Sequence, residues 1–143
     1  MILEVEHLSF AYRPERPLFY DVSFAFEQGQ VLSILGANGA GKSTLLNCIA
    51  NLLLPQQGEI RLHGTPLSRL ELREISRIIG YVPQSHTPAY DYTVRDFVVM
   101  GRAPHLGTFQ QPGRADYDLV DATLEEMGLL PLANRPYTEL SGG

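Results

Sequence analysis

Short stretches of spaced apolar residues predict strands in the first part of the chain. Apolar side chains in residues 3–8 have strand-like spacing, and residues 22–26 alternate between apolar and polar. Residues 13–17 contain two prolines and interrupt the pattern between them. Residues 1–35 are therefore expected to form strands joined by turns, in a small sheet beside the core.

Two mainly apolar stretches, residues 30–35 and 78–82, are typical of buried strands. Between them, residues 59–63 alternate and are closed by Gly64 and Pro66, which predicts a further strand.

Helical periodicity marks the remaining segments. Apolar residues recur at helical spacing from the first turn at Thr44 until Pro55, and helices are also expected at 67–77 and 93–100. A last helix has Gly128 as its stop signal and carries an apolar stripe of Tyr117, Val120, Leu124 and Met127. The stripe is interpreted as core packing.

The most specific motif is Gly-Ala-Asn-Gly-Ala-Gly-Lys-Ser-Thr at residues 36–44. It matches G-x-x-x-x-G-K-[ST] and lies between an apolar run and a predicted helix. Its four fixed positions match by chance in roughly one chain of this length in a few hundred. A dinucleotide-binding fingerprint is excluded, because Thr44 occupies the place of its last glycine. The segment is predicted to be a phosphate-binding loop.

Each residue type in this loop has a physical reason. Glycines permit backbone conformations that a Cβ would forbid, so that successive N–H groups converge on one anion. Lys42 supplies a point charge, and Ser43 can place its hydroxyl on Mg²⁺. The expected ligand is ATP with Mg²⁺, and the expected contacts come from Gly36, Asn38, Gly39, Ala40, Gly41, Lys42, Ser43 and Thr44.

Composition indicates one ordinary globular domain without a membrane span. The chain has 143 residues, of which 44% are apolar and 19% charged, and it contains no run of about 18 apolar residues. Its acidic start lacks the basic region of a signal peptide. The net charge of -5 argues against a broad nucleic-acid-binding face.

Cysteine and histidine usage offers no metal site. Cys48 is the only cysteine, which excludes an internal disulfide, favours a reducing cytosol and is interpreted as core packing. The histidines have no metal-ligand spacing and are interpreted as structural or solvated; they are His7, His63, His86 and His105.

Two residues outside the loop could complete a nucleotide site. Tyr12 precedes Gly36 by 24 positions and could stack on a base, with core packing as the alternative. Gln84 follows the second apolar run, where open α/β folds place ligand contacts.

The tail Leu140-Ser141-Gly142-Gly143 provides a second motif. Together with the phosphate loop, Tyr12 and Gln84, it makes all 143 residues resemble the nucleotide-binding subunits of ATP-binding cassette (ABC) transporters. The resemblance implies an α/β P-loop NTPase fold. Residues 1–88 would form the nucleotide-binding core with an antiparallel β subdomain, and residues 89–143 a helical subdomain, with the C-terminal part of the fold missing.

The resemblance also implies roles for particular residues. Tyr12 would stack on adenine, and Gln84 would contact Mg²⁺ or the attacking water and sense the membrane partner. Ser141, Gly142 and Gly143 match the family signature, which completes the nucleotide site of a second copy. Lys42, Gln84 and Ser141 would then act in catalysis.

The segment Thr93-Val94-Arg95-Asp96, followed by Met100-Gly101-Arg102-Ala103-Pro104-His105, is similar to importers of metal chelates. That group handles iron–siderophore, haem, cobalamin and, in some members, molybdate. The resemblance implies a dimer of ATP-binding subunits at the cytoplasmic face of the membrane. Transmembrane permease subunits and, indirectly, a substrate-binding protein would be the partners, with no nucleic acid.

The family places a strand ending in Asp-Glu, an aspartate loop and a switch histidine beyond the signature. Glu125 and Glu126 lie in a predicted helix and do not supply the acidic pair. Residues 1–143 are therefore expected to be an N-terminal piece that is inactive alone.

Two alternatives remain open, namely an ABC ATPase of DNA repair, chromosome organisation or translation, and a nucleotide-binding fragment without catalysis. The compact interval between Lys42 and Ser141 favours a transporter subunit over the first of these, because chromosome-organising and repair relatives carry long insertions there.

Overall fold

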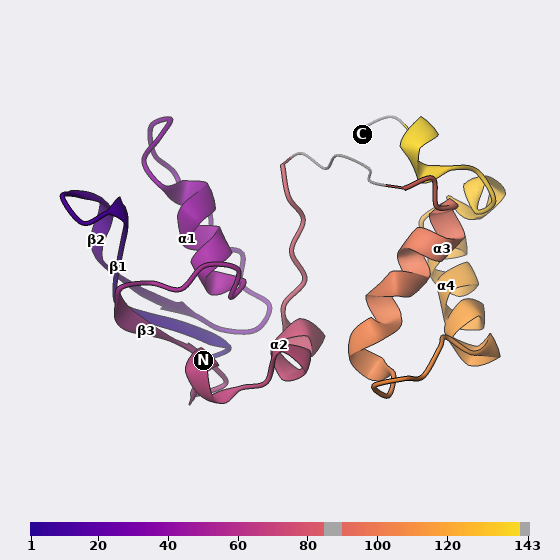
Figure 1. Ribbon diagram of the computed structural model, residues 1–143, viewed down its shortest axis with the longest axis horizontal. Helices are drawn as coiled ribbons and strands as arrows, with labels where there is room; N and C mark the ends of the chain where they lie inside the picture. The colour runs from indigo at the N-terminus through magenta and orange to yellow at the C-terminus, as the bar shows by residue number, and fades with distance from the viewer. Residues whose placement is uncertain (85–89, 141–143) are drawn as a thin grey trace. The chain divides into compact units, whose positions relative to one another are not determined.

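The computed structural model describes residues 1–84 and 90–140. The chain divides into two units, Met1–Tyr81 and a second that begins at Val82 (Figure 1). The first unit contains β1 (Leu3–Arg13), β2 (Arg16–Phe26), α1 (Lys42–Ile49), β3 (Gln57–Leu62), β4 (Thr65–Pro66), the 3₁₀ helix η1 (Leu67–Arg69) and α2 (Leu72–Ile78). The second contains α3 (Val94–Val99), η2 (Met100–His105), α4 (Arg114–Glu126), η3 (Leu130–Leu132) and η4 (Tyr137–Glu139).

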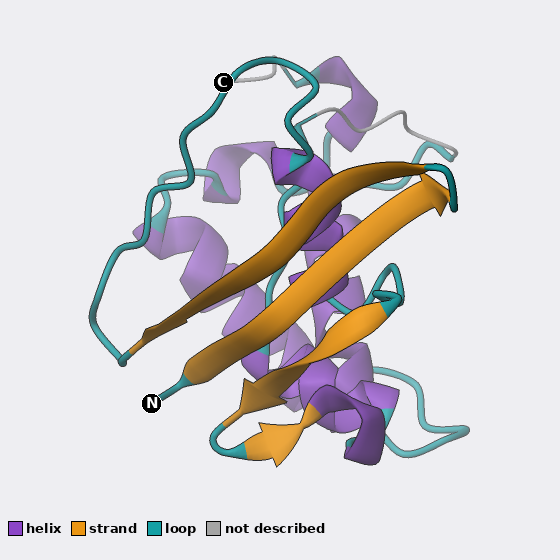
Figure 2. Cartoon of the chain, turned by 90° about the vertical axis from the view of Figure 1, so that its left-hand side faces the viewer, coloured by secondary structure: helices purple, strands orange, loops and turns teal. Residues whose placement is uncertain are grey.

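The four strands form one antiparallel sheet in the order β2-β1-β3-β4 (Figure 2). In its central strand, Leu3 lies opposite Phe26 on one side and Leu62 on the other. The predicted strands in residues 3–8, 22–26 and 59–63 are thereby confirmed. Only Pro14 and Glu15 separate β1 from β2, so the predicted break is shorter than residues 13–17.

A bulge at His7 explains the uneven apolar spacing of β1. His7 has a φ of 51°, and the pairing of β1 shifts register between Val5 and Leu8. The extra residue returns Leu8 and Phe10 to the buried face that Leu3 and Val5 also occupy. The bulge lets four apolar side chains of one strand, spaced 3, 5, 8 and 10, join the same core.

One hydrophobic core holds the first unit together. It joins the buried side chains of the sheet to those of α1, η1 and α2, and its buried members are Leu3, Val5, Leu8, Phe10, Leu45, Cys48, Ile60, Leu62, Leu67 and Ile75. Because Leu45 and Cys48 lie on α1, the core fixes the helix that follows the phosphate loop. Burial also confirms the packing role predicted for Cys48 and raises the pKa of its thiol, which keeps it protonated at neutral pH.

Two predicted strands are wrong. Residues 30–35 and 79–82 belong to no strand, and the side chains of Val31, Leu35 and Val82 are each more than nine-tenths exposed. Ile78 belongs to α2 instead. A strand requires a hydrogen-bonded neighbour, and within residues 1–84 and 90–140 neither segment has one.

Two predicted helices have different bounds. The first ends at Ile49, because Asn51 adopts a left-handed backbone with a φ of 57°, and the apolar residues 52–54 leave the helical path. The second is divided into η1 and α2 by extended residues at Leu70 and Glu71, and Glu74 closes a capping box with Glu71.

The second unit is a small helical cluster around a core of its own. Its buried members are Val94, Val99, Val120, Leu124 and Ala133. Thr93 caps α3 by accepting a hydrogen bond from the Asp96 N–H, and Gly128, with a φ of 70°, ends the last long helix as predicted. The predicted place of Met127 in the apolar stripe is wrong, because its side chain is mainly exposed.

Candidate functional site

The phosphate loop contains two glycines that its backbone requires. Gly39 and Gly41 have φ values of 82° and 91°, a region that L side chains rarely adopt. A Cβ on Gly41 would also lie 2.9 Å from Leu18 Cγ and 3.0 Å from Phe19 Cδ1. Gly36 was expected to share this role, but its φ is not left-handed and a Cβ there would make only ordinary contacts. The expectation is wrong for Gly36.

The Lys42 side chain folds over the loop that precedes it. Its Nζ donates one hydrogen bond to Gly36 O and one to Ala37 O, each 2.8 Å long. An ammonium group has three donors, so these two bonds leave one for a phosphate oxygen. The predicted loop cation is thus held directly against the loop backbone.

The loop passes into the N-terminus of α1 without a side-chain cap. The Leu45 N–H donates to Gly41 O at 2.8 Å, so the N–H groups of the preceding turn lie before the helical hydrogen-bond ladder. Free N–H groups and the helix dipole favour an anion at this position. Ser43 is exposed in the same turn, where its hydroxyl is accessible to a cation, whereas Thr44 is buried.

Asn38 and Ala40 lie in the exposed turn of the loop. The Ala40 N–H donates to Ala37 O at 3.2 Å, which closes this turn. The backbone N–H of Ala40 is therefore partly engaged within the loop itself.

Tyr12 lies beside the start of α1, although 32 positions separate it from Thr44. Its hydroxyl is 3.1 Å from Thr44 Oγ1, and its ring meets that of Phe10 edge to face at 4.9 Å between centroids. Tyr12 is 67% exposed, so its ring is not a core side chain. The geometry leaves an aromatic surface open to solvent next to the phosphate loop, as base stacking requires.

The sequence did not single out Leu18 and Phe19, which form the wall against Gly41. Both belong to β2 and are partly buried in the core of the first unit. The sequence held only a weak indication of this role, because both residues lie in the strand that follows β1, which carries Tyr12.

The remaining predicted site residues belong to the second unit or lie outside the described residues. Gln84 is exposed and belongs to the second unit. Ser141, Gly142 and Gly143 lie outside the described residues. Leu140, the first residue of the signature, packs against the core of the second unit.

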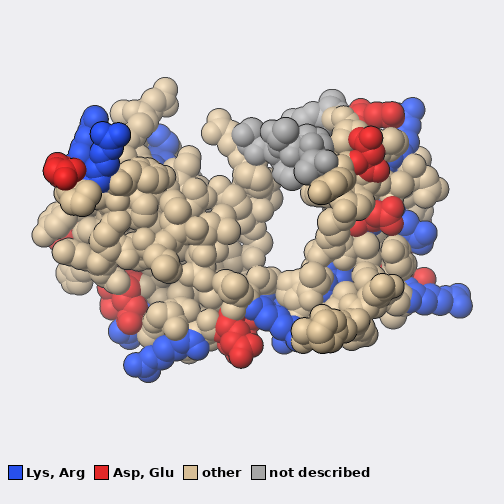
Figure 3. Space-filling model, viewed as in Figure 1, with Lys and Arg blue, Asp and Glu red and all other residues tan. Residues whose placement is uncertain are grey.

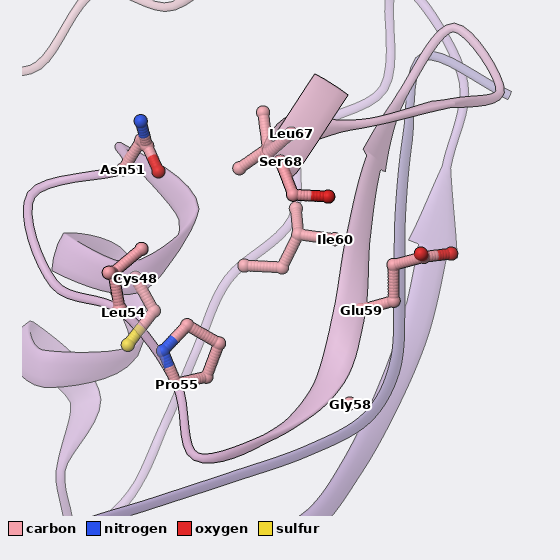
Figure 4. Close-up of a pocket in the computed structure, with 9 residues that line it drawn as sticks. All are labelled: Cys48, Asn51, Leu54, Pro55, Gly58, Glu59, Ile60, Leu67 and Ser68. Atoms are coloured by element: carbon pink, nitrogen blue, oxygen red, sulfur yellow. The ribbon is translucent and has the colours of Figure 1, made fainter. Parts of the chain in front are cut away.

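A different pocket lies at the other end of α1 (Figure 4). It is lined by Cys48, Asn51, Leu54, Pro55, Gly58, Glu59, Ile60, Leu67 and Ser68. Its walls are mainly apolar, and burial raises the pKa of its single thiol, that of Cys48. This pocket has no part in the phosphate site, because none of its residues belongs to the loop.

Comparisons with known proteins identify the family of the chain. The family model described as ABC transporter matches residues 19–143. The chain is 39% identical over 141 residues to the molybdate import ATP-binding protein MolC of Haemophilus influenzae, covering 99% of this chain and 51% of that protein. It is 36% identical over 144 residues to a protein of Helicobacter pylori named for iron chelatin transport, covering 100% and 56% of the two chains.

A solved structure described as a metal-chelate type ABC transporter in an inward-facing conformation is also similar. It shares 36% sequence identity with a TM-score of 0.79, over 99% of this chain and 50% of that one. The chain thus spans about half the length of the relatives it matches. Because the family model matches most of the sequence, including the phosphate loop, the chain belongs to the ABC transporter family.

Proposed function

We propose that residues 1–143 provide the phosphate-loop half of the ATP-binding subunit of an importer for metal chelates or related oxyanions. The observation that carries this proposal is the loop at residues 36–44, where Lys42, Gly41 and the open end of α1 converge. The relatives named for molybdate and iron chelatin transport support the cargo class.

ATP is the proposed ligand of the loop, with Mg²⁺ as its counter-ion. The left-handed glycines and the crowded wall at Gly41 fit a loop whose backbone must closely approach phosphate. Lys42 would neutralise the outer phosphates and the N–H groups of the first helical turn would bind their oxygens, while the exposed Ser43 hydroxyl would contact Mg²⁺.

Tyr12 would fix the adenine end of the nucleotide. The hydrogen bond between its hydroxyl and Thr44 Oγ1 orients the exposed ring toward the loop. Base stacking on an aromatic ring contributes about 1–3 kcal/mol. Tyr12 would therefore add affinity for a nucleoside triphosphate over inorganic phosphates.

Hydrolysis is proposed for the assembled subunit and not for residues 1–143 by themselves. Phosphoryl transfer depends on positioning and charge neutralisation, and the family resemblance places the water-orienting carboxylate beyond the signature. Within this span Gln84 would contact Mg²⁺ or water, and Ser141, Gly142 and Gly143 would contact the nucleotide of a second ATP-binding subunit.

The partners follow from the same proposal. The subunit would dimerise across ATP and dock on permease subunits at the cytoplasmic face of the membrane. A substrate-binding protein would deliver the cargo to these permease subunits. None of the helices formed by residues 1–84 and 90–140 is long and apolar enough to cross a bilayer. Exposed Tyr90, whose ring meets that of Tyr92 at 5.8 Å, is suited to a protein contact.

Titration calorimetry with ATP tests the proposal. Lys42→Ala removes a charge-assisted contact of about 1.5–3 kcal/mol and is expected to weaken ATP binding by roughly 10- to 150-fold. Arg114→Ala, which removes an exposed cation from α4, is the matched control. Equal ATP affinity in the parent and Lys42→Ala would refute the proposal. In a phosphate-release assay, Lys42-dependent turnover by residues 1–143 would contradict the proposed lack of catalysis.

A further inference from the structure

Two arginines face each other at the end of the hairpin that carries Tyr12. Arg13 ends β1, Arg16 begins β2, and the two are direct partners in the strand register. Both side chains are exposed. In Figure 3, Lys and Arg atoms gather at the upper left, where Figure 1 places the turn between β1 and β2.

This pairing is unfavourable in the protein alone. Like charges directly opposite each other on antiparallel strands repel. None of the ion pairs among residues 1–84 and 90–140 involves Arg13, Arg16 or the intervening Glu15. An anion placed between the two guanidinium groups would relieve the repulsion, and guanidinium groups bind phosphate oxygens in a bidentate geometry.

The same turn lines a pocket with a volume of about 430 Å³, a size typical of small-ligand sites. Its walls are Tyr12, Arg13, Arg16, Pro17 and Leu18. Two of these residues also contact the phosphate loop region. Tyr12 is hydrogen-bonded to Thr44, and Leu18 forms the wall against Gly41. The pocket therefore shares two of its wall residues with the surroundings of the loop and of the first turn of α1.

We propose that Arg13 and Arg16 bind the α-phosphate of the nucleotide. This inference rests on the proposed function, in which Lys42 and α1 hold the outer phosphates and Tyr12 holds the base. The phosphate attached to the sugar then lies between these two points, beside the pocket that the arginines line. The hairpin end would thus contribute to the binding of ATP and AMP, and not to the binding of pyrophosphate at the two outer positions.

Displacement of a fluorescent ATP analogue from the 143-residue chain tests this division. Three competitors are compared: ATP, AMP and pyrophosphate, which matches only the two outer phosphates. The double variant Arg13→Ala/Arg16→Ala is expected to weaken ATP and AMP by about 10-fold each, the loss of one charge-assisted contact, and pyrophosphate by less than about 2-fold. Lys42→Ala is expected to show the reverse pattern, with pyrophosphate weakened and AMP retained.

Arg69→Ala is the matched control, because it removes an exposed cation from the same unit outside this pocket. Arg13→Lys/Arg16→Lys keeps the charge and is expected to recover part of the AMP affinity. Equal weakening of AMP and pyrophosphate in the double variant, or an equal effect of Arg69→Ala, would mean that the arginines act only through net charge and would overturn the inference. If Lys42→Ala leaves the affinity for ATP unchanged, the proposed function is refuted. If Lys42→Ala weakens ATP binding but the double arginine variant does not, only this inference is refuted.

Discussion

Two segments of the first unit have similar apolar sequences and different structures. Strand β1 pairs on both sides, and its Leu8 is completely buried. Residues 31–35 are as apolar, yet they have no strand partner and Leu35 is 91% exposed. Apolar character alone therefore does not predict a strand, because a strand forms only where a second strand supplies hydrogen bonds.

This difference between paired and unpaired segments affects the phosphate loop, because the loop is fixed by packing on one side and follows an unpaired segment on the other. On the α1 side the loop is held by Tyr12, Leu18 and the buried face of the helix. On the other side it follows residues 31–35, which are unpaired among the described residues. The family resemblance implies a strand near the loop from sequence beyond residue 143, and the relatives are about twice as long. That pairing stays a prediction.

The largest effect is expected at the paired segment. Leu8→Ala removes a fully buried side chain from the centre of the core and should lower the free energy of unfolding by about 2–5 kcal/mol. Urea unfolding followed by circular dichroism measures the loss. A loss below about 1 kcal/mol would mean that the core around β1 is not tightly packed.

Gly58→Ala tests the bulge that aligns β1 with β3. Gly58 has a φ of 87°, and its Cβ would lie 2.4 Å from the Glu6 carbonyl oxygen, so the substitution should cost at least about 1–3 kcal/mol. Gly64→Ala is the control, because Gly64 also has a positive φ of 76° but would place its Cβ in open space. Equal unfolding free energies for the two variants would argue against the close approach at Gly58.

The unpaired segment should respond weakly. Leu35→Ala changes an almost fully exposed side chain, so the free energy of unfolding of the 143-residue chain should stay within about 0.5 kcal/mol of the parent. The same chemical change at Leu8 and Leu35 thus separates paired from unpaired apolar sequence. A loss at Leu35 comparable to that at Leu8 would contradict the comparison.

The smallest effect concerns the second unit and pH. The hydrogen bond from Arg102 Nε, 2.9 Å long, and then the Gly113 N–H lower the pKa of Asp116 below its usual value. Because the folded pKa is lower than the unfolded one, the stabilisation is present above the unfolded pKa of about 3.9 and is lost as pH falls through the folded pKa. Asp116→Asn should therefore flatten the acid side of the stability profile, whereas an unchanged profile would contradict the assigned ion pair.

Local signals in the sequence predicted the left-handed glycines at Gly39 and Gly41 and the helix after them, while phosphate binding by the loop stays a prediction. The glycine spacing, the single lysine and the following helix are all encoded within residues 36–49, and the cap at Thr93 and the stop at Gly128 are equally local. Contacts between distant residues could not be predicted in this way. The Tyr12–Thr44 bond spans 32 positions and the Arg102–Asp116 pair spans 14, so both depend on tertiary packing.

The errors have the same origin. A continuous apolar run at residues 30–35 indicates burial, but the sequence of the run does not specify its partner. The bulge at His7 was likewise hidden, because it lies where Gly58 closely approaches β1 across the sheet, a contact between residues distant in the sequence. Asn51 ended α1 earlier than the apolar pattern suggested, because one left-handed residue outweighs several leucines at helical spacing.

Affinity labelling of Lys42 tests the central claim, that the loop binds ATP, most directly. An acyl-phosphate derivative of ATP transfers its acyl group to an amine close to the γ-phosphate and releases ATP. Lys42 is the only lysine among the 11 basic Lys and Arg residues, so the α-amino group of Met1 serves as an internal control. We predict a label on Lys42 that excess ATP suppresses, with no such protection at Met1. Labelling of Lys42 that excess ATP leaves unchanged would contradict the account.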